Sequence, residues 1–520
     1  MSDATAGAVP PGGGWHQVIG YDWKSITVPN LRDWTPTRTV SVVIPAYQCQ
    51  AKLDRTLAAL AHQRYPADLL EVVIADDGSP EPLRLPRVRP ENTRLLSLTR
   101  DKEWGRARAC HAGAEAAHGE VLLFLDADMV AFPDHVAAHA RWHHVSADAV
   151  TLGHKLFVDF EGVTVEAVAE AAHQDRLQEL LDDRPHTEHD WVESFIARTE
   201  DLTQYSPKLF MAAVGSTVGL RTELYREAGG FRTDMRSGED MEIGYRLMTA
   251  GAFFVPEREA RSWHQGPATY MSRAAEVRRR NRPNFSNYIP APRPFRPAVP
   301  GRQYAVPKVT VLVAWDGVDY ERAAASVDSL LGAAETDLRV EICCAVTADE
   351  VDLLHAHYRD EGRVSLRPDP PASGFPSPYT LQVSGPAGFQ AHAVSALMRL
   401  VERDQLGVVD VLVPDSDAEV ILWRTAALHR ARRAAIGDED INDVVARLFG
   451  EGQVDGRGLG IVDLRVARPA AGTVGSGGSR NRRMSKRYRR LRRKHDQLLQ
   501  RRLVRLALRL GNLRRRRGRG

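Results

Sequence analysis

The sequence of 520 residues lacks any apolar run close to the ~20 residues that a membrane-spanning helix needs. Residues 1–14 are small and rich in glycine and proline, without the apolar segment of a signal peptide. The four cysteines, Cys49, Cys110, Cys343 and Cys344, follow neither metal-site nor disulfide-framework spacing. These absences argue against a helical membrane protein and against a disulfide-stapled secreted domain. We therefore expect a cytoplasmic protein.

Charge is distributed unevenly along the chain. Residues 480–520 hold 19 of the 70 lysines and arginines and one acidic residue, which leaves 51 basic and 66 acidic residues, a net charge of −15, in residues 1–479. Leucines three or four positions apart run through the basic segment and predict an amphipathic helix. Such a helix suits an anionic membrane surface or an anionic polymer, and the alternative is a solvated, disordered charge run.

An apolar strand that ends in two carboxylates is the most informative motif. Residues 122–125 are apolar throughout and are followed directly by Asp126-Ala127-Asp128. A buried strand has no room for charge along its length, so the aspartates emerge at its carboxyl end, where open α/β sheets bind ligands. Asp126 and Asp128 are suited to hold Mg²⁺ or Mn²⁺ there, directly or through water. Acidic loop ends without a ligand are the alternative.

Two earlier segments predict strands that end at the same edge. Residues 39–46 and 71–75 are apolar, and leucines at helical spacing lie between them. Strands that alternate with helices predict a mostly parallel, doubly wound α/β sheet. Its carboxyl edge would then gather Tyr47, Asp76 and Asp77 with the acids after the strand at 122–125, around a crevice of nucleotide size.

These motifs together resemble the nucleotide-binding half of family 2 glycosyltransferases, which have the GT-A fold. The matching pieces are Val-Val-Ile-Pro-Ala-Tyr at 42–47, Ala-Asp-Asp-Gly-Ser at 75–79, a helix at 105–113, and 119–128. The similarity extends over about 39–266. It implies a Rossmann-like GT-A catalytic domain, a nucleotide-diphosphate sugar as donor, UDP-sugars by family habit, and Mn²⁺ or Mg²⁺ as cofactor.

Motifs farther along the chain resemble the family's catalytic helix and the segment after it. The resemblance of 237–247 to that helix implies Asp240 as general base, with Glu239 beside it. The resemblance of 261–264 implies His264 as a third metal ligand. The alternatives are two acids that simply favour a helix N-terminus, and an ordinary surface or core histidine.

The resemblance also implies which residues bind the donor nucleotide. Asp76 and Asp77 would accept hydrogen bonds from the base or ribose, with an Asx-capped turn as the alternative. Where many relatives have Ala-Arg-Asn-x-x-Gly, residues 109–113 are Ala-Cys-His-Ala-Gly, so Arg106 or Arg108 would replace the missing arginine. The residues expected to bind the nucleotide are Pro45, Ala46, Tyr47, Asp76, Asp77, Arg106, Arg108 and Asp126.

A weaker copy of the pattern follows a proline-rich stretch. Residues 308–315 resemble 39–46, residues 410–417 resemble 120–128, and the acceptor region has no counterpart. We expect a degenerate GT-A-like lobe that scaffolds, dimerises or binds acceptor, and a second active site on the acids of 410–417 is the alternative. The predicted domains are an N-terminal extension (1–38), a GT-A catalytic domain (39–289), a Pro-rich linker (290–307), the degenerate lobe (308–465), a flexible linker (466–480) and a basic amphipathic tail (481–520).

The sequence thus predicts a metal-dependent hexosyltransferase. It would move a sugar from a nucleotide-diphosphate sugar to a hydroxyl of a glycan or lipid-linked cell-envelope acceptor. The resemblance implies inversion at the anomeric carbon, and retention is the alternative. The Gln-x-x-Arg-Trp element of processive relatives does not follow His264, which favours non-processive transfer. The tail would place the enzyme peripherally on the inner face of the membrane, and a homo-oligomer is compatible with the sequence. The alternatives are a non-catalytic nucleotide-sugar or glycan-binding protein of the same fold, and a nucleic-acid-associated protein that acts through the tail.

Overall fold

The chain divides into two compact units. The computed structural model describes residues 17–100, 104–267, 269–290, 295–296, 299, 301–316, 318–345, 347–413, 416 and 418–464. The predicted basic tail and the flexible linker before it lie outside these residues. In the part of the chain that is described, no helix is both long enough and apolar enough to cross a membrane. The first unit comprises Met1–Thr310, Ser373–Thr380 and Trp423–Gly450, and the second comprises Val311–Ala372, Leu381–Leu422 and Glu451–Gly520.

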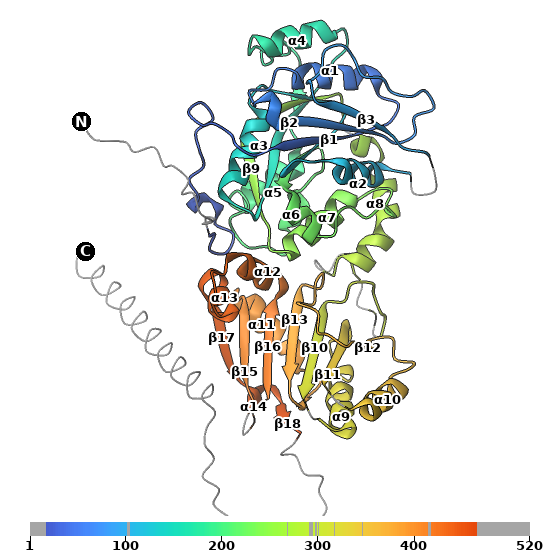
Figure 1. Ribbon diagram of the computed structural model, residues 1–520, viewed down its shortest axis with the longest axis vertical. Coiled ribbons are helices and arrows are strands. Elements are labelled where there is room, and N and C mark those ends of the chain that lie inside the picture. The colour runs from blue at the N-terminus through green and yellow to red at the C-terminus, as the bar shows by residue number, and fades with distance from the viewer. Residues whose placement is uncertain are drawn as a thin grey trace, which may run out of the picture. The chain divides into compact units, whose positions relative to one another are not determined.

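The first unit is built on a mixed sheet, to which the described residues contribute nine strands (Figure 1). In sheet order these are β3 (Thr93–Ser97), β2 (Leu70–Asp76), β1 (Val40–Ala46), β4 (Val121–Leu125), β8 (Thr217–Arg221), β6 (Ala149–Val158), β9 (Phe253–Gln265) and β5 (Met129–Ala131), with β7 (His186–Thr187) on β6. The first four strands are parallel, β8 is antiparallel to β4 and β6, and β6 is parallel to β9. The predicted α/β class is confirmed.

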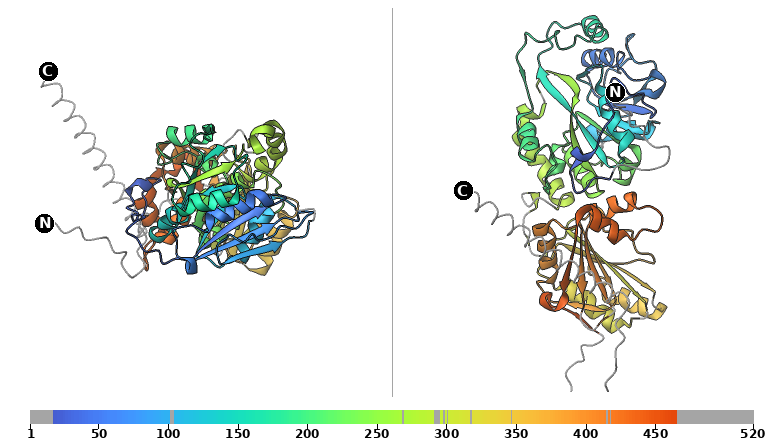
Figure 2. Two further views of the ribbon diagram at one scale, coloured as in Figure 1. Left: turned by 90° about the horizontal axis from the view of Figure 1, so that it is seen from above. Right: turned by 90° about the vertical axis from the view of Figure 1, so that its left-hand side faces the viewer.

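Helices cover both faces of this sheet, and its strands twist relative to one another (Figure 2). The leucine stripe of α1 (Gln50–Leu60) packs on one face of β1, and α2 (Arg106–Ala116) packs on the other face, against Val43. A Cβ at Gly113 of α2 would lie 2.5 Å from Cγ1 of Val43, so only glycine allows this approach. The other helices of the unit are α3 (His135–Val145), α4 (Val165–His173), α5 (Asp190–Arg198), α6 (Thr222–Glu227), α7 (Glu239–Thr249), α8 (Thr269–Tyr288), α12 (Thr425–Ala434) and α13 (Ile441–Phe449), with 3₁₀ turns at Trp23–Ser25, Ala67–Leu69 and Leu209–Ala212.

Helix α3 places a row of buried histidines against strands β6 and β8 of the sheet. His135, His139 and His143 lie one helical turn apart, and none is more than 1% exposed. The hydroxyl of Thr217 lies 2.9 Å from Nε2 of His135 and 3.0 Å from Nε2 of His139. The hydroxyl of Thr151 lies 2.7 Å from Nδ1 of His139 and 3.3 Å from Nε2 of His143. This row of five residues satisfies most of its polar atoms internally, as a buried polar network must.

A second sheet is formed by the C-terminal half of the chain, with seven strands among the described residues. In sheet order they are β12 (Val364–Leu366), β11 (Leu338–Ala345), β10 (Val309–Asp316), β13 (Tyr379–Ser384), β16 (Glu419–Arg424), β15 (Val408–Leu412) and β17 (Glu451–Asp455), and a separate pair joins β14 (Ala387–Phe389) to β18 (Ile461–Asp463). The helices between these strands are α9 (Tyr320–Leu331), α10 (Ala348–His357), α11 (Ala393–Asp404) and α14 (Gly456–Leu459).

The strand order of the second sheet repeats that of the first and corrects one predicted correspondence. In both sheets the first three strands lie in reverse order and the fourth joins beside the first, so that β13 takes the place of β4. The expected match of 410–417 with 120–128 is wrong, because β15 occupies the place of β6. After β13 the chain continues as Gly385-Pro386, where β4 is followed by Asp126-Ala127-Asp128. The second sheet therefore has no carboxylates at the corresponding strand end, and Asp415 and Asp417 themselves lie outside the described residues.

Candidate active site

The strand ends of β1, β2 and β4 meet at one edge of the first sheet. The register pairs Pro45 with Ala75 and Ala46 with Asp76, and the amide of Asp77 donates to the carbonyl of Ala46 at 2.9 Å. On the other side of β1, Val43 pairs with Phe124, which sets the end of β4 at the same level. The predicted convergence of the three loops is therefore present.

The two aspartates after β2 hold the local backbone. Asp76 is 2% exposed and accepts from the amide and hydroxyl of Ser79 at 3.0 and 2.6 Å, and from the amide of Leu83 at 3.2 Å. Asp77 accepts from the amide of Gly105 at 2.7 Å and from Nη1 of Arg108 at 3.4 Å. These contacts form the Asx-type turn that was the alternative interpretation, and they tie Arg108 to the loop.

An aromatic group stands beside the end of β1. The rings of Tyr47 and Trp104 are 5.0 Å apart in an edge-to-face arrangement. The guanidinium of Arg100 lies 4.7 Å from the ring of Trp104 and donates to the hydroxyl of Tyr47 at 3.4 Å. The indole nitrogen of Trp104 is buried and has no partner among the described residues. Tyr47 was predicted here, whereas no spacing in the sequence pointed to Trp104.

Arg106 connects the acid after β4 with the acids that begin α7. Its Nε and Nη2 lie 2.9 and 2.8 Å from Oδ1 of Asp126, and its Nη1 lies 3.1 Å from Oε1 of Glu239. Nη2 also donates to the carbonyl of Gly215. Burial and the neighbouring charge of Asp240 raise the pKa of Glu239, against the opposing effect of Arg106. The predicted catalytic helix and the predicted metal-binding loop are thus joined through one arginine.

The first turn of α7 carries Asp240 next to the 214–217 segment. Gly238, which precedes the helix, has φ of +77°, and a Cβ there would lie 2.6 Å from atoms of Asn281 and Phe285. Glycine is therefore required at this turn. The carboxylate of Asp240 accepts from the amide of Gly215 at 3.4 Å and from the amide of Met241 at 2.7 Å.

The second acid of the pair, Asp128, lies beside His264. Register pairing of β5 with β9 brings Met129 opposite His264, and Nε2 of the imidazole lies 3.5 Å from Oδ1 of Asp128. Nδ1 of His264 is 2.7 Å from the carbonyl of Gly266. A carbonyl oxygen only accepts, so this contact assigns a proton to Nδ1, and in the neutral imidazole Nε2 is then the nitrogen that can bind a metal. On its other oxygen, Asp128 accepts from Nζ of Lys52 at 3.1 Å.

A carboxylate oxygen and an imidazole nitrogen are donors that suit Mn²⁺ or a similar divalent cation. Within the described ranges no three His, Cys, Asp or Glu side chains are grouped so that they could hold a metal. Asp128 and His264 therefore fit a cation that takes its remaining ligands from water and substrate phosphates. Asp126, the other predicted ligand, is paired with Arg106 instead.

Cys110 stands where relatives were expected to carry an arginine. It is fully buried on α2, and burial raises the pKa of its thiol to about 12, so it is a neutral core residue. The site residues that sequence reasoning missed are Lys52 and Trp104. Only their contacts with Asp128 and Tyr47 reveal them.

Known proteins resemble this chain in the same region. Residues 41–194 match the family model described as Glycosyl transferase family 2. The chain is 25% identical over 376 residues to the chondroitin synthase of Pasteurella multocida (strain Pm70), and this alignment covers 67% of the chain and 38% of the synthase. It is 33% identical over 256 residues to the validoxylamine A glucosyltransferase of Streptomyces hygroscopicus subsp. limoneus, and that alignment covers 48% of the chain and 55% of the glucosyltransferase. A solved mannosyltransferase, PcManGT from Pyrobaculum calidifontis in complex with GDP-Man and Mn2+, aligns with a TM-score of 0.35 and 18% identity over 53% of this chain and 72% of that one.

An α/β domain with acids at these strand ends and a family match over the same residues is a glycosyltransferase domain of the GT-A type. Residues 41–194 carry the match to family 2 glycosyltransferases, and over this part of the chain the predicted family and enzyme class are confirmed. The chain spans only 38% and 55% of the lengths of the two curated relatives, so its full reaction is a separate question.

Proposed function

We propose that this protein transfers a sugar from a nucleotide-diphosphate sugar to an acceptor hydroxyl, with inversion, in a reaction that depends on a divalent cation. The observation that carries the proposal is the pairing of Asp128 with Nε2 of His264 at 3.5 Å, at the sheet edge that also presents Asp126 and the first turn of α7. A carboxylate and an imidazole at a strand end are suited to receive a diphosphate together with its cation.

The donor would lie along the carboxyl ends of β1, β2 and β4. Pro45 and Ala46 form the floor there, and Tyr47 with Trp104 offers an aromatic surface for a base. Asp76 and Asp77 hold the loop, while Arg106 and Arg108 supply positive charge near the diphosphate. The relative named as a glucosyltransferase, 33% identical, supports a hexose as the transferred sugar, and UDP-sugars are the first donors to test.

Chemistry would take place between the cation site and α7. A bound Mn²⁺ or Mg²⁺ would neutralise the departing diphosphate. Asp240, at the start of α7, would take the proton from the attacking acceptor hydroxyl. Glu239, whose pKa is raised by burial, stays paired with Arg106 and so holds Asp126 and Gly215 in place. A single attack of this kind inverts the anomeric centre.

The acceptor class and the cellular location that we propose draw on a relative and on the rest of the chain. A glycan or lipid-linked cell-envelope acceptor fits the synthase named among the relatives. The basic tail (481–520) would bind an anionic membrane surface or an anionic polymer and keep the enzyme peripheral to the inner face of the membrane. The second sheet, with Gly385-Pro386 in place of the acids, would serve as a degenerate scaffold or as a surface for a second copy of the chain.

The test is release of nucleoside diphosphate from a panel of UDP- and GDP-sugars with Mn²⁺. The wild-type chain should hydrolyse one donor slowly, and chelation of the metal should abolish this activity. Asp128→Asn and Asp240→Asn should each lower the rate by about 10²-fold or more. The exposed Asp438→Asn is the matched control and should leave the rate unchanged. Donor binding without turnover in the wild type would instead identify a nucleotide-sugar-binding protein.

A further inference from the structure

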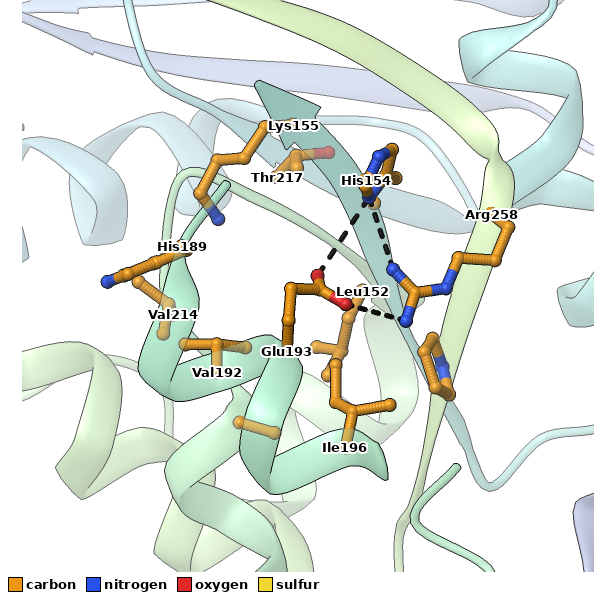
Figure 3. Close-up of a pocket in the computed structure, with 13 residues that line it drawn as sticks. Leu152, His154, Lys155, His189, Val192, Glu193, Ile196, Val214, Thr217 and Arg258 are labelled. Carbon is orange, nitrogen blue, oxygen red and sulfur yellow. Dashed lines mark hydrogen bonds and ion pairs between the residues drawn. The ribbon is translucent and has the colours of Figure 1, made fainter. Parts of the chain in front are cut away.

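A pocket lies next to the site between α5, β6 and β9 (Figure 3). Its lower part is apolar and includes Val192 and Ile196 of α5. It reaches Thr217 on β8, one residue after Ser216, whose carbonyl accepts from the amide of Asp126 at 3.0 Å. The pocket therefore adjoins the acid after β4, on the side away from the donor strands β2 and β3.

Charges on one wall of the pocket satisfy one another. Arg258 lies 2.7 Å from Oε2 of Glu193 and 3.1 Å from Nδ1 of His154, and His154 lies 3.8 Å from Glu193. Although burial works in the opposite direction, these bonds lower the pKa of Glu193 to about 2. Glu193 is therefore ionised, with its charge balanced by Arg258. The polar groups of this wall bind one another and leave little hydrogen-bonding capacity for a ligand.

The opposite wall carries two nitrogens with no such partners. The side chain of Lys155 on β6 has neither a hydrogen bond nor an ion pair with any residue in the described part of the chain, and Figure 3 shows it extending toward His189. Nδ1 of His189 is buried and likewise lacks a partner there. A partly buried polar group without a partner is costly, so a bound ligand is the natural occupant.

The charge of this wall is positive. Burial lowers the pKa of Lys155 to about 8, and the carboxylates of Asp126, Glu193 and Asp240 act against that effect. Lys155 is therefore mostly protonated at neutral pH. Burial also lowers the pKa of His189 to about 4, so this imidazole is neutral and available as a hydrogen-bonding group.

An exposed aromatic ring stands beside His189. Trp191 is 39% exposed, and its ring lies 5.4 Å from that of His189 in an edge-to-face contact. Because His189 lines the pocket, this contact places an exposed apolar ring next to it. Its flat face is suited to a sugar ring, while Lys155 is suited to a negative substituent on that sugar.

We propose that this pocket is the acceptor subsite and that it selects sugars bearing an anionic group, which Lys155 binds while Trp191 supports the ring. This proposal rests on the proposed transferase function and adds the chemical class of the acceptor to it. A carboxylate and a phosphate offer the same kind of oxygen anion to an ammonium group, so both belong to the test.

The experiment measures binding of three small probes to the full chain, in the presence of Mn²⁺ and nucleoside diphosphate, by ligand-observed NMR. The probes are methyl glucuronide, glucose 6-phosphate and neutral methyl glucoside. At least one anionic probe should bind about fivefold or more tightly than the neutral one, as one partly buried charge pair provides. Preference for the carboxylate or for the phosphate probe identifies the anionic group.

Variants test whether Lys155 causes the preference for anionic probes. Lys155→Met should remove the preference for the anionic probes, Lys155→Arg should keep part of it, and the exposed Lys208→Met is the matched control that should keep all of it. Acceptor-independent release of nucleoside diphosphate is measured in parallel in Lys155→Met, and it should be unchanged in the Lys208→Met control. Equal binding of all three probes, or a preference that survives in Lys155→Met, overturns the proposal. Loss of donor hydrolysis in Lys155→Met also overturns it, because Lys155 would then serve the donor. Absence of donor hydrolysis from the wild type contradicts the transferase function itself, a separate result.

Discussion

The buried histidines of α3 make the first unit sensitive to mild acid. Burial lowers the pKa of His135 to about 4 and that of His143 to about 3, and it lowers the pKa of His139 well below its ordinary value. His135 and His143 are therefore neutral in the folded chain near pH 5, and the pKa of His139 is shifted in the same direction. In the unfolded chain a histidine has a pKa of about 6.5. As the pH falls, the unfolded state therefore binds protons that the folded state does not bind.

The direction and size of the pH effect on the free energy of unfolding follow from this difference in pKa. Stability due to these groups is complete above pH 6.5 and is lost as the pH falls toward the folded-state pKa. Between pH 7.5 and pH 5.0, His135 and His143 should each reduce the free energy of unfolding by about 2 kcal/mol, and His139 acts in the same direction. A loss of about 4 kcal/mol or more is a large part of the 5–15 kcal/mol that is typical of a folded domain.

The assay is urea unfolding at pH 7.5 and pH 5.0, followed by tryptophan fluorescence, since Trp142 on the same helix is buried. His143→Gln should shrink the difference between the two pH values by about 2 kcal/mol, whatever it does to stability at pH 7.5. The exposed His355→Gln is the control and should leave that difference unchanged. A wild-type stability that is the same at both pH values would refute the reasoning.

Two further predictions concern charged contacts. Lys52→Met should tighten Mn²⁺ binding by about two- to fivefold in an electron paramagnetic resonance titration, because its ammonium lies 3.1 Å from Asp128 and competes with a cation. Unchanged affinity would show that Lys52 does not compete. Glu257 is 4% exposed, pairs with Arg141 at 2.8 Å and accepts from the indole of Trp142 at 2.5 Å, so Glu257→Gln should cost about 3–5 kcal/mol of unfolding free energy. A loss below about 1 kcal/mol in urea unfolding would contradict this estimate.

The sheet edge could be predicted because its signals are local. An apolar run that ends in polar residues has one reasonable arrangement, and three such runs, two of them ending in acids, place Tyr47, Asp76 and Asp126 together. The proximity of Asp128 and His264 came from the family resemblance, since 135 intervening residues give no local signal. Lys52 and Lys155 were missed because a lysine on a helix or strand is ordinary, and only the fold shows which carboxylate or pocket it faces.

The second sheet shows how motif similarity can mislead. Residues 410–417 resemble 120–128 in letters, yet strand order gives β13 the place of β4. By strand order, the segment at the position of the acidic loop is Gly385-Pro386, which carries no carboxylate, so no motif in the sequence pointed to it.

The central claim is that Asp128 and His264 hold the cation that receives the donor diphosphate. Anomalous diffraction from crystals of the full chain grown with Mn²⁺ and UDP tests it most directly. The claim predicts a manganese peak bonded to the Asp128 carboxylate, to Nε2 of His264 and to the diphosphate oxygens, with Lys52 displaced. A diphosphate bound with no manganese beside Asp128, or manganese bound elsewhere, would contradict it.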